Sequence, residues 1–235
     1  MVESVTTVDP PIQLWMGETG GAFNSGCNGS TNAFMSGYWY LPALAGLAQH
    51  GHDLFCRQTL LGGNYELLDK VLVTSCSVRS NLMFQVSLLP NPDYYSAVLY
   101  ARLMGKRLLK SDATMEQDAV RIYSHCTANA PGSVTVLYLN YADVEMTIGV
   151  SLENGLSAED MKRYEYILTP VAVDNPNVDL LHSNKVALNG ELLVPAPDGT
   201  IPDMPPVTVS NGAIVVPGYS YGYLVFPDAH ADACL

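Results

Sequence analysis

A single glutamate, Glu18, stands where an apolar run meets a glycine-rich turn. Residues 14–22 have the sequence LWMGETGGA, which predicts a short buried strand followed at once by the turn. In a barrel of parallel strands, the active site is built from side chains at the carboxyl ends of the strands. A carboxylate at a strand tip therefore indicates a catalytic group. The alternative is an ordinary loop or helix-capping carboxylate.

The cysteines are the second set of residues that could take part in chemistry. There are five of them, and no C-x-x-C pair or nearby histidine gives them the spacing of a zinc site. We expect no metal site and no cofactor. Composition alone leaves open that all are reduced thiols. Their positions are Cys27, Cys56, Cys76, Cys126 and Cys234.

Two β/α units are predicted around Glu18. Residues 12–17 indicate the first strand, and residues 32–49 a helix that Asn32 caps. A second strand is predicted over 53–61, and residues 92–109 are expected to form a helix with a proline in its first turn. Two such units are too few to close a barrel of eight.

The pattern of residue types changes from about residue 120. Short alternating or β-branched segments follow one another, separated by Gly, Pro, Asn and Asp, which predicts an antiparallel β-sandwich. We therefore expect an α/β part over 1–118 and an all-β part over 119–235. The predicted strands include 134–139, 146–150, 164–168, 185–188, 213–216 and 220–226.

Composition narrows the classes of partner. The chain has 235 residues, 48% of them apolar, and a net charge of −12. Such a length and composition support one large domain or two small ones with a sizeable core. The negative charge disfavours nucleic acid and anionic membranes, and direct binding of a sulfated glycan by this part would be weak.

Three separated motifs in order resemble the heparanase-like glycoside hydrolases of family 79, especially the plant type. They are WMGETGGAFNSG at 15–26, RQTLLGGNY at 57–65 and PNPDYYSA at 90–97. Shorter likenesses continue at 123–127 (YSHCT) and 186–190 (VALNG) and cover nearly the whole chain. The resemblance implies a retaining glycosidase built as a (β/α)8 TIM barrel followed by a β-sandwich, with this chain holding the last two β/α units and the sandwich.

The same resemblance implies roles for individual residues. Glu18 takes the place of the nucleophile at the tip of the seventh strand. Gln58, Gly63 and Tyr65 carry over as residues that line the sugar site, and Asn24 and Ser25 fall in the stretch that approaches the sugar carboxylate. For Tyr65 the alternative is a loop aromatic that packs on the barrel rim. Arg57 either keeps Glu18 ionised or forms a buried structural ion pair.

The sequence also departs from the family pattern. It contains no Asn-Glu pair, the motif that carries the family's acid/base glutamate, and barrel strands one to six are absent. We expect a truncated or partial product that needs the missing N-terminal barrel segment for a complete fold. Residues 70–89 form an atypical insertion, interpreted as a retained intron or a lineage-specific addition.

The resemblance revises the interpretation of the cysteines. Animal relatives join the cysteine of the His-Cys-Thr segment to the one near the C-terminus, which implies a disulfide between Cys126 and Cys234. A disulfide implies a secretory compartment. We expect the full-length protein to be secreted, to the cell wall or to a vacuole or lysosome, although residues 1–7 lack the features of a signal peptide.

Three functions remain open from the sequence. The first is a portion of a retaining β-glucuronidase-type hydrolase, exo or endo, that cleaves glucuronic-acid-bearing polysaccharides or glycosides. The second is a non-catalytic heparanase-like binding or structural protein, favoured by the absent acid/base. The third is a cytosolic β-sandwich scaffold, which free thiols at Cys126 and Cys234 would support.

Overall fold

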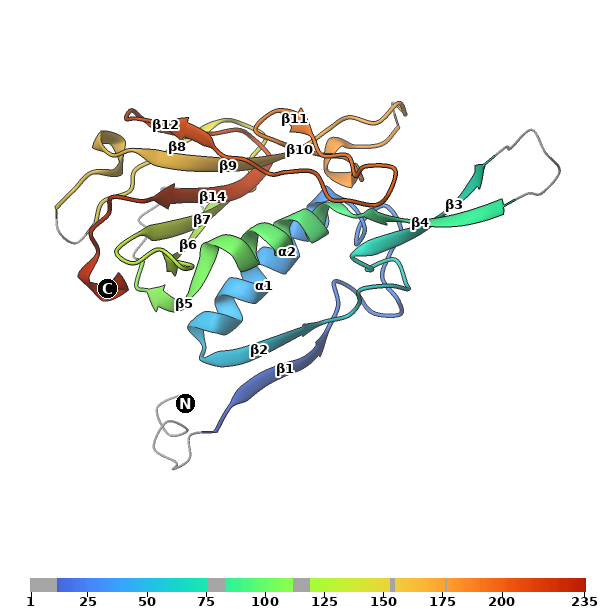
Figure 1. Cartoon of the computed structure of the whole chain (residues 1–235), viewed down its shortest axis with the longest axis horizontal. Coiled ribbons are helices and arrows are strands. Elements are labelled where there is room, and N and C mark those ends of the chain that lie inside the picture. Colours follow the sequence, from blue (N-terminus) through green and yellow to red (C-terminus); the bar gives the residue numbers. More distant parts are fainter. Residues whose placement is uncertain (1–11, 76–82, 112–118, 153–154, 176) are drawn as a thin grey trace.

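The chain folds into an α/β part followed by an antiparallel β part. The structure is a computed structural model and describes residues 12–75, 83–111, 119–152, 155–175 and 177–235. Helices α1 (Gly37–Gln49) and α2 (Pro92–Leu103) lie between the pair of strands β1 (Leu14–Thr19) and β2 (His52–Arg57) and a large sheet (Figure 1).

Two parallel strands begin the described chain. β1 (Leu14–Thr19) pairs with β2 (His52–Arg57), and α1 (Gly37–Gln49) connects them after a 3-10 turn over Phe34–Ser36. The predicted strands and helix are thus present, with shifted ends. The expected cap at Asn32 is wrong: its side-chain Oδ1 accepts a hydrogen bond from the Gly29 amide at 2.7 Å instead, and the helix starts later.

The second helix, α2 (Pro92–Leu103), is shorter than predicted. Residues 104–109 form strand β5 (Met104–Leu109), which pairs with β6 (Val120–Thr127). A Cβ on Gly105 would lie 2.4 Å from the Cys126 carbonyl oxygen, so glycine permits this close approach. The antiparallel sheet therefore begins ahead of the expected boundary at residue 119.

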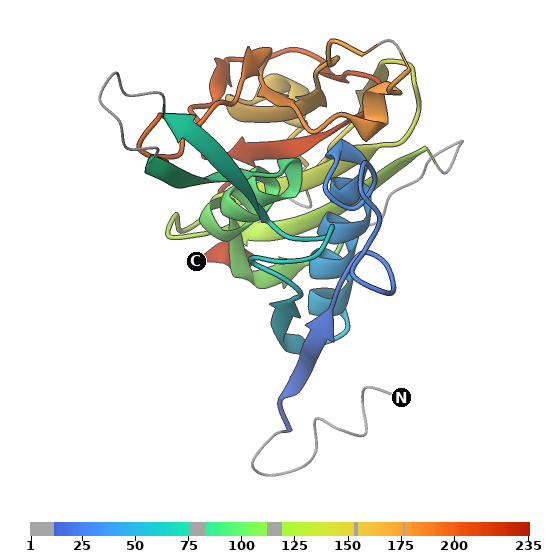
Figure 2. The same cartoon turned by 90° about the vertical axis from the view of Figure 1, so that its right-hand side faces the viewer.

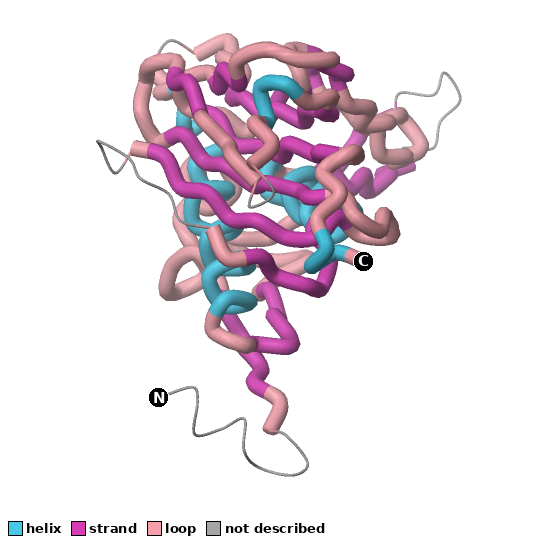
Figure 3. Tube along the Cα trace, turned by 90° about the vertical axis from the view of Figure 1, so that its left-hand side faces the viewer, coloured by secondary structure: helices cyan, strands magenta, loops and turns pink. Residues whose placement is uncertain are grey.

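The large sheet has eight strands in the order β11-β10-β9-β14-β7-β6-β5, with β12 also paired to β9. Figure 3 shows its strands side by side. A small antiparallel pair, β8 with β13, stands apart from it. The remaining strands are β7 (Val134–Asn140), β8 (Met146–Ile148), β9 (Arg163–Pro170), β10 (Val186–Leu188), β11 (Glu191–Leu192), β12 (Val207–Val209), β13 (Ile214–Val216) and β14 (Ser220–Phe226).

The central strands β7 and β14 are buried on both faces. On β14, Tyr221 and Tyr223 join the core that includes side chains of α1 and α2, whereas Leu224 and Phe226 join the core beneath β8 and β13. Side chains alternate between the faces of a strand, so one strand serves two cores. This explains why the sequence of β14 lacks a polar face.

Close packing fixes α1 on the sheet. The Phe34 and Tyr221 rings stack with centroids 4.4 Å apart, and a Cβ on Gly37 would lie 2.4 Å from the Tyr221 ring. The Tyr223 hydroxyl donates a 2.9 Å hydrogen bond to the Ser96 carbonyl of α2. The two parts of the chain therefore share one continuous interior.

The expected insertion forms a β-hairpin. β3 (Leu68–Ser75) pairs antiparallel with β4 (Met83–Pro90), and the ribbon projects from the body of the molecule (Figures 1 and 2). Leu88 and Leu89 are exposed near its base. Residues 76–82, with the predicted thiol of Cys76, lie outside the described residues.

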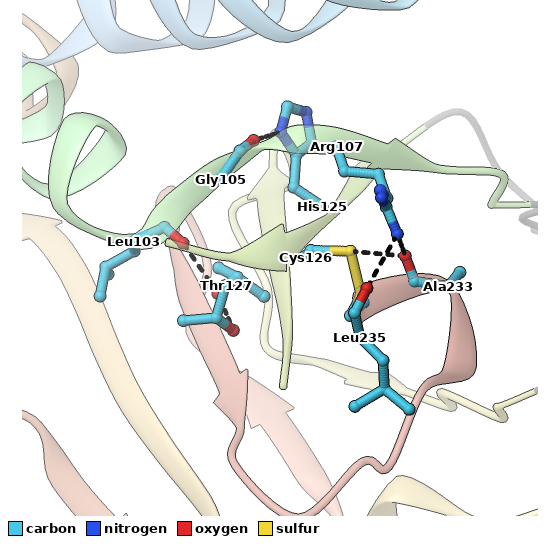
Figure 4. Close-up of a disulfide and its surroundings, with 10 residues drawn as sticks. Leu103, Gly105, Arg107, His125, Cys126, Thr127, Ala233 and Leu235 are labelled. Carbon is cyan, nitrogen blue, oxygen red and sulfur yellow. Dashed lines mark hydrogen bonds between the residues drawn. A yellow bond between two sulfur atoms is a disulfide. The ribbon is translucent and has the colours of Figure 1, made fainter. Parts of the chain in front are cut away.

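The implied disulfide is confirmed. Cys126 of β6 is bonded to Cys234 in the last 3-10 turn (Asp232–Cys234), with Cα atoms 5.3 Å apart (Figure 4). Arg107 of β5 donates a hydrogen bond to the Ala233 carbonyl beside it. The interpretation that all the cysteines are reduced is wrong, whereas Cys27 and Cys56 are free thiols.

Candidate active site

The predicted site residues meet where β1 and β2 end. Thr19 and Arg57 are register partners in this parallel pair, and the Gln58 amide donates a 2.8 Å hydrogen bond to the Thr19 carbonyl. The residues that follow both strands therefore lie at one edge. An open pocket of about 540 Å³ occupies this edge, lined by Glu18, Thr19, Gly20, Ala22, Phe23, Asn24, Ser25, Gln58 and Tyr65.

Glu18 is exposed at the wall of this pocket. Among the described residues, none forms a hydrogen bond or an ion pair with its carboxylate. It is also the only acidic residue that lines the pocket within the described part of the chain. An unpartnered carboxylate in an open pocket is free to approach a bound molecule.

The loop after β1 has an unusual backbone. Asn24, Ser25 and Gly26 have φ values of 56°, 69° and 80°, three successive residues in the left-handed region. Asn and Gly adopt this region readily, and serine much less so. The loop is anchored, because the Ser25 carbonyl accepts a 2.6 Å hydrogen bond from the Asn64 amide.

Tyr65 lines the pocket and is itself 8% exposed. Its ring lies among three glycines: a Cβ on Gly20, Gly26 or Gly63 would approach the ring to 3.2, 3.1 and 3.1 Å. Tyr65 is thus both a packed loop aromatic and a pocket residue. Gly63 is absent from the lining residues within the described chain and packs behind the ring, so the structure gives it a supporting position.

Arg57 points away from the pocket into an ion pair. Its guanidinium lies 2.6 Å from the Asp93 carboxylate, and these side chains are 6% and 0% exposed. It also donates a 2.9 Å hydrogen bond to the Tyr65 carbonyl. Of the two interpretations of Arg57, the buried structural ion pair is confirmed.

Asp93 was not predicted as part of this arrangement, because its place in the first turn of a helix suggests simple capping. Burial raises the pKa of Asp93 to about 6, while Arg57 and the Ser36 hydroxyl lower it. The Arg57 guanidinium also lies 4.8 and 4.6 Å from the ring centroids of Trp39 and Tyr40. Together they hold the Tyr65 backbone from behind the pocket.

Within the described residues, no group of three or more His, Cys, Asp or Glu side chains is arranged to hold a metal ion. No helix of the described chain has both the length and the apolar character needed to span a bilayer.

Comparison with known proteins gives glucuronidases and heparanase-like proteins among the relatives. The chain is 42% identical to a baicalin-beta-D-glucuronidase of Scutellaria baicalensis over 91% of its length, and 35% identical to heparanase-like protein 1 of Arabidopsis thaliana over 96%. It is 31% identical over 96% to the heparanase of Gallus gallus. The chain spans 36%, 42% and 40% of these relatives' lengths.

A family model and a solved structure extend the comparison. The structure is similar to that of a Paenibacillus polymyxa xyloglucanase from glycoside hydrolase family 44, with a TM-score of 0.50 and 11% identity over 95% of this chain and 34% of that one. This likeness concerns the fold alone. The model of the glycosyl hydrolase family 79 N-terminal domain matches residues 1–45. The chain belongs to the heparanase-like proteins of glycosyl hydrolase family 79.

Proposed function

We propose that this chain carries the nucleophile of a retaining β-glucuronidase-type glycoside hydrolase. The observation that supports this best is the single pocket where Glu18, Asn24, Gln58 and Tyr65 meet at the ends of two parallel strands. In our proposal, these strands are the last two of a (β/α)8 barrel, and the antiparallel part is the sandwich that follows.

Glu18 attacks the anomeric carbon of the sugar. The glycosidic bond breaks as the ester to Glu18 forms, and a second carboxylic acid protonates the leaving oxygen. Water, deprotonated by that second group, then hydrolyses the ester with overall retention. Gln58 and Tyr65 hydrogen-bond the sugar, and the loop at Asn24 and Ser25 lies against its carboxylate.

The second carboxylate comes from outside the part of the pocket described above. Within the described residues only Glu18 supplies a carboxylate there, and the sequence contains no Asn-Glu pair. The β1–β2 pair is a sheet of two strands, with Trp15 61% and Leu54 41% exposed. A further barrel segment would cover such apolar surface and pair the open strand edges.

The substrates we propose are glucuronic-acid-bearing polysaccharides or glycosides. Relatives of this chain are a baicalin-beta-D-glucuronidase, heparanases and a hyaluronoglucuronidase of Hirudo nipponia. We also propose a secretory location, in the cell wall or in a vacuole or lysosome, because the Cys126–Cys234 disulfide would persist in an oxidising compartment.

One observation favours a second candidate function. A pocket with one carboxylate lacks half of the pair that hydrolysis needs. The chain would then be a non-catalytic glucuronide-binding protein of the same family. The two candidates differ in whether Glu18 forms a bond to the sugar.

A substrate that needs no acid catalyst distinguishes the two candidate functions. β-D-glucuronyl fluoride releases fluoride without protonation by the enzyme, so Glu18 alone suffices for the first step. We expect a burst of fluoride stoichiometric with the chain, followed by slow release that azide accelerates. Glu18→Gln should abolish the burst, whereas Glu191→Gln, at an exposed position on β11, should retain it. Equal bursts from both variants would contradict the proposal.

A further inference from the structure

We propose that Asn28 is an N-glycosylation site, so that the protein carries an oligosaccharide on the loop between β1 and α1. Residues 28–30 have the sequence Asn-Gly-Ser, and no other asparagine of the sequence is followed two residues later by Ser or Thr. Such a triplet is an acceptor for N-linked glycan in a secreted protein. The inference therefore rests on the secretory location in our proposed function, and it is independent of the chemistry of Glu18.

The triplet lies in a tight turn at the surface. The amides of Ser30 and Thr31 donate hydrogen bonds of 3.1 and 2.9 Å to the Cys27 carbonyl, which closes the turn over Asn28. Asn28 is exposed, and Gly29 has a φ of 77°, a left-handed conformation that glycine adopts without strain. The loop stands at the outside of the molecule beside α1 (Figure 2). The turn therefore presents Asn28 to solvent.

The side chain of Asn28 keeps its nitrogen free. Its Oδ1 accepts a 2.9 Å hydrogen bond from Nδ2 of Asn32, while Oδ1 of Asn32 accepts from the Gly29 amide at 2.7 Å. Among the described residues, Nδ2 of Asn28 donates to no acceptor. Glycosylation uses Nδ2 and leaves the oxygen of the amide as it is. The turn therefore depends on the atom of Asn28 that survives modification and makes no use of the atom that reacts.

Contacts on both sides of Asn28 hold the turn on the body of the protein. The Thr31 hydroxyl donates to the Asn64 carbonyl at 2.6 Å, which joins this loop to the one that follows β2. Nδ1 of His182, in the antiparallel part, lies 2.5 Å from the Gly29 carbonyl oxygen. Neither contact involves the Asn28 side chain, so a glycan there leaves both in place.

The reaction transfers a sugar chain to the amide nitrogen of Asn28. The donor is a lipid-linked oligosaccharide, and the cell's oligosaccharyltransferase catalyses the step. A bond forms between Nδ2 and C1 of the first sugar as the bond from C1 to the lipid diphosphate breaks. The diphosphate leaves with the electron pair of that bond, and Nδ2 loses a proton. Transfer takes place as the chain enters the compartment, before folding partly buries Ser30.

The test follows the whole chain as it enters microsomes. The chain is translated in vitro with a cleavable signal peptide and endoplasmic-reticulum microsomes, and only molecules protected from added protease are counted. We expect a species of reduced gel mobility that peptide N-glycosidase returns to the unmodified position. Asn28→Gln and Ser30→Ala should each abolish the shift, whereas Ser30→Thr should retain it.

The chain offers a matched control at another Asn-Gly pair. Asn211 is exposed and is followed by glycine, as Asn28 is, but Ala213 stands where the serine would be. Asn211 should stay unmodified in the natural sequence, and Ala213→Ser should add a second shift. This second shift shows that the transferase of the microsomes is active on the chain.

Two outcomes would overturn the inference. One is a protease-protected chain without a shift, and the other is a shift that persists in Asn28→Gln. Because the added signal peptide supplies entry, either outcome leaves the proposed function and location standing. Failure of the proposed function has a different signature, an absent fluoride burst, which leaves the result at Asn28 unaffected.

Discussion

Replacing Arg57 by methionine removes the cation that Asp93 faces behind the pocket. The Asp93 side chain is fully buried, and among the described residues its remaining side-chain partner is the Ser36 hydroxyl, which donates to it at 3.1 Å. The substitution also removes the 2.9 Å hydrogen bond to the Tyr65 carbonyl. Breaking a buried ion pair by deleting one partner costs about 3–5 kcal/mol, and we expect this loss in the free energy of unfolding at pH 7.

The pH dependence distinguishes a charge effect from lost packing. In Arg57→Met, the isolated Asp93 carboxyl can take up a proton, so the loss should shrink between pH 7 and pH 5. In Asp93→Asn the buried guanidinium cannot lose its proton, so the loss should not shrink over this range. Urea unfolding followed by tryptophan fluorescence measures both. Arg121→Met is the control, since this exposed guanidinium lies 5.7 Å from the Tyr141 ring and should be worth less than about 1 kcal/mol. A loss from Arg57→Met no larger than the control's would refute the reasoning.

Three further predictions concern stability. Reducing the Cys126–Cys234 bond, whose cysteines are 108 residues apart, should lower the free energy of unfolding by up to about 4–5 kcal/mol; an unchanged urea midpoint would contradict this. Gly37→Ala should lower the free energy of unfolding by about 1–3 kcal/mol, because its Cβ would lie 2.4 Å from a tyrosine ring. Gly46→Ala should stabilise the helix, because a Cβ there would have nothing within 4 Å. Equal shifts in the melting temperature of the two variants would count against the packing described. Burial raises the pKa of Asp93 from 3.8 to about 6. The contribution of this group to stability is therefore fully present below about pH 4 and is lost as the pH rises to about 6. Asp93→Asn should remove this pH dependence from the free energies of unfolding measured between pH 4 and pH 7.

The sequence predicted the elements better than their ends. The long, strongly patterned strands β7 and β14 lie where the β-branched and aromatic runs indicated them. The boundary between α2 and β5 was missed because Leu108 and Leu109 continue the apolar spacing of the helix. What ends the helix is the tertiary approach of β6 to Gly105, which a local pattern does not contain.

The candidate site, too, was predictable from the sequence only in part. A glutamate before a glycine-rich turn, and the motif that ends at Tyr65, were sufficient to bring most of the site together. The partner of Arg57 was not predictable, because Asp93 is 36 residues away and only packing makes them neighbours. Phe23 was overlooked since an apolar residue within a recognised motif gives no sign of its exposure.

The central claim is that Glu18 forms a bond to a glucuronic acid ring. The most direct measurement is mass spectrometry of the chain after incubation with 2-deoxy-2-fluoro-β-D-glucuronyl fluoride, in which the leaving fluoride needs no acid and the remaining fluorine slows hydrolysis of the ester. We predict one fluoroglucuronyl adduct per chain, located on Glu18 at the end of β1, and its loss in Glu18→Gln. An unmodified chain, or an adduct on any other residue, would contradict the account.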